Sequence, residues 1–195
     1  MNPIRKLAQR RRRVLVATAL ALPLLVTGCS KDVNNNDVAG VESDPKPTTL
    51  AVDKARAQTN HLSSLILDMI GIKEGKVTEG GAGVSLCDND PDHFYRMRHP
   101  WSIYQVSEGK LKQGFQRLRK NLPERGWKIV DYGPNSSKAK VLELTADSKN
   151  EPYSVNAVLV VSTPTHSHES NPRIEVTVVS ACFRAPKGTD LGKEF

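Results

Sequence analysis

The sequence lacks an apolar run long enough to cross a membrane as a helix. The apolar segment Val14–Val26 is shorter than the roughly 18–20 residues that such a helix needs, and Pro23 interrupts it. Acidic residues are absent from residues 1–29, which contain six Lys and Arg residues. A basic segment followed by a short apolar one is typical of an export signal.

Outside this leader the chain also lacks a marked excess of charge. The net charge of the whole sequence is +7. Of the 28 Lys and Arg residues, 22 lie outside the leader, together with all 21 Asp and Glu residues. The chain outside the leader therefore has a net charge of about +1. A strongly basic protein favours an acidic partner such as nucleic acid. Because the excess lies in the leader, we expect no nucleic-acid partner.

A complete set of catalytic motifs is missing as well. Residues 107–110 match the S-x-x-K string of penicillin-recognising enzymes, but Lys187-Gly188-Thr189 has the wrong order for the required Lys-Thr-Gly element. Residues 83–87 lack the second glycine of a nucleophile elbow, and residues 81–83 lack the third glycine of a dinucleotide-binding loop. These absences favour a non-catalytic protein that needs no cofactor.

The leader ends in a motif that does carry chemistry, Val26-Thr27-Gly28-Cys29. It resembles a bacterial lipobox, in which small residues let the peptidase bind the backbone closely and the cysteine thiol accepts diacylglycerol. We therefore predict a signal peptide over residues 1–28, cleavage between Gly28 and Cys29, and lipidation of Cys29. The lipid would hold the protein on the extracytoplasmic face of the cell membrane. The alternative is an ordinary secretory signal, or an uncleaved anchor, that happens to contain a cysteine.

The remaining chain divides into three parts. Residues 29–49 are polar, without helical or strand periodicity, and predict a flexible tether. Residues 50–184 predict one domain, and residues 185–195 a loose C-terminal tail. If Cys29 carries lipid, Cys87 and Cys182 remain as a pair in an oxidising compartment, so we predict a disulfide between them. The alternative is two free buried thiols.

The domain combines helical and strand patterns. Residues 51–70 have helical spacing and end at Gly71, and a second helix follows Ser107 as its cap. Strands are predicted over 84–87, 101–106, 127–132, 140–145, 153–163 and 173–183. We expect an α+β two-layer sandwich, with an antiparallel sheet of about four to five strands and two helices on one face. Cys182 shares a face of the last strand with Ile174, so we expect it to point into the core.

Three groups of residues are candidate sites. His166 and His168, with Glu169 beside them, have the spacing of zinc ligands on extended chain, although an exposed loop explains them equally well. Residues 88–92 have a carboxylate at every second position, and such oxygen ligands suit Ca²⁺. His93 and His99 follow them, but the segment lacks the glycine and the glutamate of an EF-hand loop. The aromatic residues that could shape a binding face are Trp101, Tyr104, Trp127 and Tyr132.

The layout resembles small uncharacterised actinobacterial cell-surface lipoproteins. The resemblance is carried by the lipobox of residues 26–29, the polar tether, Cys87, the Arg125-Gly126-Trp127 segment and the closing Ser180-Ala181-Cys182. It implies an envelope location and an α+β domain, and it transfers no catalytic residues.

Two functions remain open. The first is a lipid-anchored, non-catalytic binding or accessory module of the cell envelope, with an unknown envelope ligand or protein as its partner. The second is a small extracellular metal-dependent hydrolase that uses His166 and His168.

Overall fold

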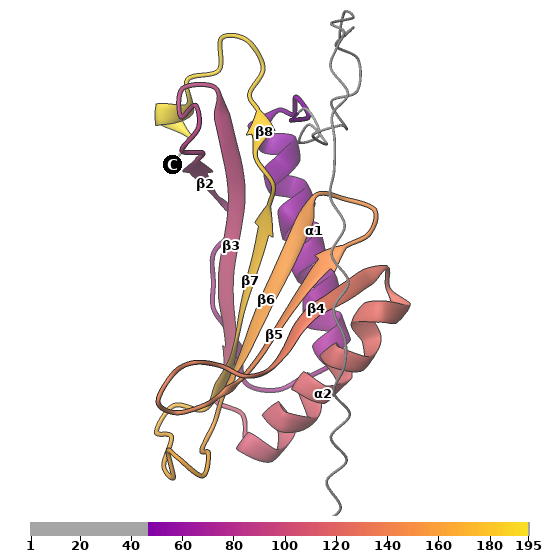
Figure 1. The fold of residues 1–195 in the computed structure, drawn as a ribbon, viewed down its shortest axis with the longest axis vertical. Coiled ribbons are helices and arrows are strands. Elements are labelled where there is room, and N and C mark those ends of the chain that lie inside the picture. Colours follow the sequence, from indigo (N-terminus) through magenta and orange to yellow (C-terminus); the bar gives the residue numbers. More distant parts are fainter. Residues whose placement is uncertain (1–46, 195) are drawn as a thin grey trace, which may run out of the picture. The chain divides into compact units, whose positions relative to one another are not determined.

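The computed structural model describes residues 47–194. The predicted signal peptide, the lipidation site Cys29 and most of the predicted tether therefore lie outside the described residues. Within the described residues, two helices, eight strands and a short 3-10 helix follow one another (Figure 1): α1 (Val52–Ile70), β1 (Lys76–Val77), β2 (Gly83–Leu86), β3 (Phe94–Tyr104), α2 (Glu108–Glu124), β4 (Trp127–Pro134), β5 (Leu142–Ser148), β6 (Tyr153–Val160), β7 (Arg173–Ser180), β8 (Phe183–Arg184) and η1 (Leu191–Lys193).

Both predicted helices form where the apolar spacing placed them. Helix α1 ends at Gly71, whose left-handed backbone (φ 65°) lets its N–H donate to the carbonyl of Leu67. Helix α2 begins after Ser107, but the Ser107 side chain makes no capping bond. Among the described residues, no helix is both long enough and apolar enough to span a membrane.

All paired strands of the sheet are antiparallel. The order is β1-β3-β7-β6-β5-β4, and β2 and β8 also pair with β3. The α+β class with an antiparallel sheet is thus confirmed, whereas the expected number of four to five strands is wrong because the sheet has eight. The added strands are short: β1 and β8 have two residues each and β2 has four, too few to show a period-2 pattern.

Strand β3 is longer than its predicted part, residues 101–106, because Pro100 and the charged residues before it obscure the pattern. A proline within a strand needs a position where no ladder donor is required. The Ser102 N–H faces the β1 side and bonds Thr78 Oγ1, so the nitrogen of Pro100, two residues earlier, faces the same side. Its missing donor falls in the gap between β2, which pairs as far as Arg98, and β1, which pairs from Ile103.

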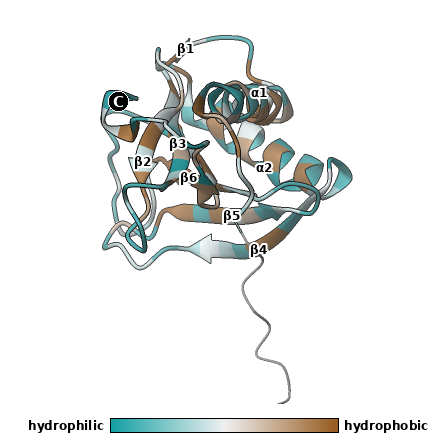
Figure 2. Ribbon diagram, turned by 90° about the horizontal axis from the view of Figure 1, so that it is seen from above, coloured by the Kyte–Doolittle hydropathy of each residue, from teal (hydrophilic) through white to brown (hydrophobic). Residues whose placement is uncertain are grey.

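The core lies between the helices and alternate residues of the strands. In β6 and β7 every second side chain is buried, among them Val155, Ala157, Ile174 and Val176. Helix α1 contacts β3 and β7, helix α2 contacts β4, β6 and β7, and the two helices contact each other. Figure 2 shows the helices side by side next to the strands.

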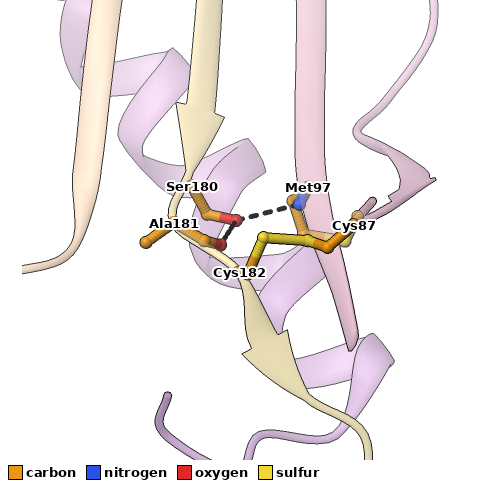
Figure 3. The surroundings of a disulfide bond; sticks show 5 residues. All are labelled: Cys87, Met97, Ser180, Ala181 and Cys182. Atoms are coloured by element: carbon orange, nitrogen blue, oxygen red, sulfur yellow. Dashed lines mark hydrogen bonds between the residues drawn. A yellow bond between two sulfur atoms is a disulfide. The ribbon is translucent and has the colours of Figure 1, made fainter. Parts of the chain in front are cut away.

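The disulfide between Cys87 and Cys182 is present, with 6.3 Å between the Cα atoms. Cys87 follows β2 and Cys182 lies between β7 and β8, so the bridge connects segments that pair with the two sides of β3 (Figure 3). One extra residue separates the β7 register from that of β8, as in a β-bulge. Ser180 Oγ fills the interruption by accepting the Met97 N–H at 2.9 Å.

The prediction that Cys182 points into the core is wrong, and the bulge is the reason. The residue that follows the bulge takes the inward place, so Phe183 is buried at 3% exposure while Cys182 is half-buried. A sequence period of two cannot reveal this shift, because the inserted residue changes the side on which every later residue lies.

The described C-terminal residues pack on the domain, which differs from the expected loose tail. Leu191 is buried, and the Ala185 N–H donates to the carbonyl of His93. Arg56 of α1 bonds the carbonyl of Glu194 at 3.1 Å and lies 3.5 Å from its carboxylate. These contacts come from scattered residues and produce no periodic pattern in the sequence.

Candidate functional site

A pocket of about 240 Å³ lies between helix α1, strand β3 and the segment that follows β1. Its lining combines hydroxyl, amide, imidazole and indole groups with two aliphatic side chains and contains no Asp, Glu, Lys or Arg. The lining residues are Asn60, Ser63, Ser64, Leu67, Val77, Thr78, Gly80, His99 and Trp101.

His99 and Ser63 meet at the wall of this pocket. The inward residues of β3 are Tyr95, Met97, His99, Trp101 and Ile103, so the strand alternation turns the imidazole toward α1. Ser63 lies on the buried face of α1 and is 4% exposed. Its Oγ is 2.8 Å from Nδ1 of His99.

Burial controls the protonation of this histidine. It lowers the pKa of the His99 imidazole below the ordinary value of 6.5, and a hydrogen bond with the Gly80 backbone opposes part of that shift. The ring is therefore neutral at pH 7. A neutral ring that donates one N–H to the Gly80 carbonyl accepts the Ser63 hydroxyl at its other nitrogen, Nδ1.

Trp101 contributes an unused hydrogen-bond donor. The residue is 5% exposed, and its indole Nε1 is one of two buried side-chain polar atoms in the described part of the chain with no hydrogen-bond partner; the other is Oε2 of Glu151. An unpaired buried donor costs about 1–3 kcal/mol. Trp101 lines the pocket, but Nε1 itself has less than 1 Å² of accessible surface, so a ligand recovers this cost only when the groups that cover Nε1 move aside for an acceptor oxygen.

Asn60 presents a second donor. Its Oδ1 accepts the Ala82 N–H at 2.9 Å and so holds the segment after β1 against α1. This bond fixes the orientation of the amide, because its oxygen must point toward Ala82 and its NH₂ group must then take the other position. Asn60 and Trp101 both belong to the pocket lining, so an amide and an indole ring lie in the same wall.

The Ser63–His99 pair has the composition of a nucleophile and its base, but its surroundings favour a structural role. A serine nucleophile needs an exposed Oγ and donors for the oxyanion, whereas Ser63 is nearly fully buried within a helix. No family model, curated protein or solved structure matches this chain. The lining of the pocket consists of neutral polar groups and a partly apolar wall.

The predicted zinc ligands are not part of this pocket. His166 and His168 are exposed on the loop between β6 and β7. His166 Nε2 lies 3.6 Å from Oε2 of Glu169. Within residues 47–194 no group of three or more His, Cys, Asp and Glu side chains is placed to hold a metal ion.

The predicted calcium segment forms a turn beside the disulfide. Its Asp90 accepts a bond from the His93 N–H and its Oδ1 lies 2.9 Å from Nδ1 of the same histidine. His99 does not join it and lies in the pocket instead. Of the four candidate aromatics, Trp101 lines the pocket, while Tyr132 stacks on Phe115 and lies under the guanidinium of Arg119.

Lowering the pH is expected to weaken the fold through His99. Between the lowered pKa and 6.5 the unfolded chain binds a proton that the folded chain does not. The stabilisation is therefore complete above pH 6.5 and is lost as the pH falls through the folded pKa. We expect the free energy of unfolding, measured with urea at about pH 7.5 and about pH 5, to fall more in the wild type than in His99→Gln, which cannot titrate. Equal losses in the two proteins would contradict this assignment.

Proposed function

We propose that this chain is a lipid-anchored lipoprotein of the actinobacterial type. Its domain acts on the extracytoplasmic face of the cell membrane as a non-catalytic binding or accessory module of the envelope. The anchoring rests on the order of basic segment, apolar segment and lipobox up to Cys29. We also propose that the domain is a two-layer sandwich with both helices on one sheet face, which the helix–strand contacts support.

The observation that carries the binding role is the pocket at Trp101. It has a buried donor without a partner, a fixed amide at Asn60 and no charged side chain in its lining. Pockets of this kind, with a few converging polar groups on a partly apolar wall, are typical of ligand sites. No observation in the described residues favours the metal-dependent hydrolase.

The test uses the full chain with Cys29→Ser, so that lipid cannot hold the protein on a membrane. We expect this variant to lose the fatty-acid label of the wild type and to leave the membrane fraction in cells. The purified variant is expected to bind isolated cell envelopes through its pocket and therefore to sediment with them. A second substitution, Ser64→Arg, places a charge on an exposed pocket residue and is expected to abolish sedimentation.

The matched control is Ser167→Arg, which makes the same change at an exposed serine on the β6–β7 loop and is expected to leave sedimentation unchanged. Unaltered labelling and membrane retention of Cys29→Ser would refute the anchoring. Absence of sedimentation, or equal sedimentation of the Ser64→Arg and Ser167→Arg proteins, would refute the binding role.

A further inference from the structure

We propose that the pocket at Trp101 binds one uncharged sugar ring of an envelope polysaccharide. This inference rests on the proposed function and names the ligand class of the same site. It follows from the charge of the pocket, from the kind of polar groups in its lining and from its size.

The absence of charged side chains from the lining favours a neutral ligand. No Asp, Glu, Lys or Arg lines the pocket, so a carboxylate, phosphate or ammonium group would enter without an opposite charge. Burying an unpaired charge is far more costly than burying a hydroxyl that can form hydrogen bonds. His99 supplies no compensating charge, because the ring is neutral at pH 7.

The polar groups match those of a sugar. Hydroxyls both donate and accept hydrogen bonds, and the pocket offers partners of both kinds. The indole Nε1 of Trp101 and the amide NH₂ of Asn60 are donors, and Ser64 Oγ, which donates its own proton to the backbone carbonyl of Asn60 at 3.0 Å, can accept a hydrogen bond. Leu67 and Val77 give an apolar wall against which the C–H groups of a ring can pack.

The size selects a single ring. The pocket volume of about 240 Å³ is below the range of about 300–1,000 Å³ that is usual for drug-sized ligands. The segment on one side of the opening, from Val77 to Gly80, is exposed, so the rest of a polymer can continue into solvent. A terminal or branching monosaccharide therefore fits better than an extended chain.

The experiment uses the full chain with Cys29→Ser and Trp127→Phe. The sequence has two tryptophans, so Trp101 remains as the only indole fluorophore and its emission reports binding directly. The probes are glucose, galactose, arabinose and N-acetylglucosamine, with glucosamine and glucuronic acid as charged analogues. We expect a saturable fluorescence change with at least one neutral sugar, and about tenfold weaker binding of the charged analogues.

Asn60→Asp tests the donor role without removing the structural bond. The aspartate keeps the oxygen that accepts the Ala82 N–H, but replaces the NH₂ donor with a second carboxylate oxygen. We expect about tenfold weaker binding of the neutral sugar. Asn150→Asp makes the same change at an exposed asparagine outside the pocket and is expected to leave binding unchanged. Trp101→Phe, in a chain that keeps Trp127, is expected to lose binding by calorimetry while its circular dichroism spectrum stays native.

Three results would overturn the inference: no saturable change with any neutral sugar, equal binding of the charged analogues, or equal effects of Asn60→Asp and Asn150→Asp. If the Cys29→Ser chain still sediments with envelopes in a manner sensitive to Ser64→Arg, only the sugar assignment fails. If sedimentation is absent as well, the proposed function fails with it.

Discussion

Replacing both Cys87 and Cys182 with serine is expected to lower the free energy of unfolding by about 4 kcal/mol. The two cysteines are 95 residues apart in the sequence, so the bridge closes a large loop of the unfolded chain and removes much of its conformational freedom. Urea unfolding of the wild type and of the double variant would measure the change.

The matched control is Cys29→Ser, which removes a cysteine outside the described domain and is expected to leave its stability unchanged. We expect the double variant to keep a native circular dichroism spectrum without urea. The bulge at the bridge has its own hydrogen bonds, from the Met97 N–H to Ser180 Oγ and from the Ala181 N–H to the carbonyl of Pro152. A loss below about 1 kcal/mol would show that the bridge restrains the unfolded chain little.

The bridge illustrates what the sequence could predict about this fold. Counting cysteines after assigning Cys29 to lipid identified the pair correctly. The local geometry was not predictable, because it depends on one inserted residue between β7 and β8 that only the pairing with β3 reveals. Segments with a repeated pattern, such as α1 with 19 residues and β7 with 8, were predicted, whereas β1 and β8 have two residues each.

The pocket was missed for a related reason. The prediction treated His99 only as a possible companion to other metal ligands, and Ser63 was not singled out. A signal was present: His99 occupies an inward position in the alternating series from Tyr95 to Ile103, and Ser63 lies on the apolar stripe of α1. A polar residue on a buried face needs a partner. The sequence shows that need on each element, but only the packing of α1 against β3 shows that the two residues satisfy each other.

The wall of the pocket depends on a glycine outside it. Gly75 has a left-handed backbone (φ 81°) and precedes β1, which contributes Val77 to the pocket. A Cβ at this position would lie 2.5 Å from the carbonyl oxygen of Tyr104 and would overlap Cγ2 of Val106. The Tyr104 carbonyl belongs to the backbone of β3 and cannot rotate away as a side chain can. Any larger residue must therefore move β1 away from β3.

Gly75→Ala is accordingly expected to lower the free energy of unfolding by about 3 kcal/mol. About 1–2 kcal/mol of this comes from the left-handed conformation, and the remainder from the steric overlap. Since Lys76 and Val77 pair with Tyr104 and Ile103, the same shift displaces one side of the pocket. We expect ligand affinity to fall together with stability, as measured by urea unfolding and by Trp101 fluorescence.

Gly83→Ala separates this effect from the general consequence of adding a methyl group. A Cβ at Gly83 has no heavy atom within 4 Å, and its backbone is not left-handed, so a change within about 0.5 kcal/mol is expected. If the two alanine variants proved equally stable, Gly75 would not be what holds β1 in place. If Gly75→Ala lost stability but bound ligand normally, the position of β1 beside β3 would not determine the shape of the binding wall.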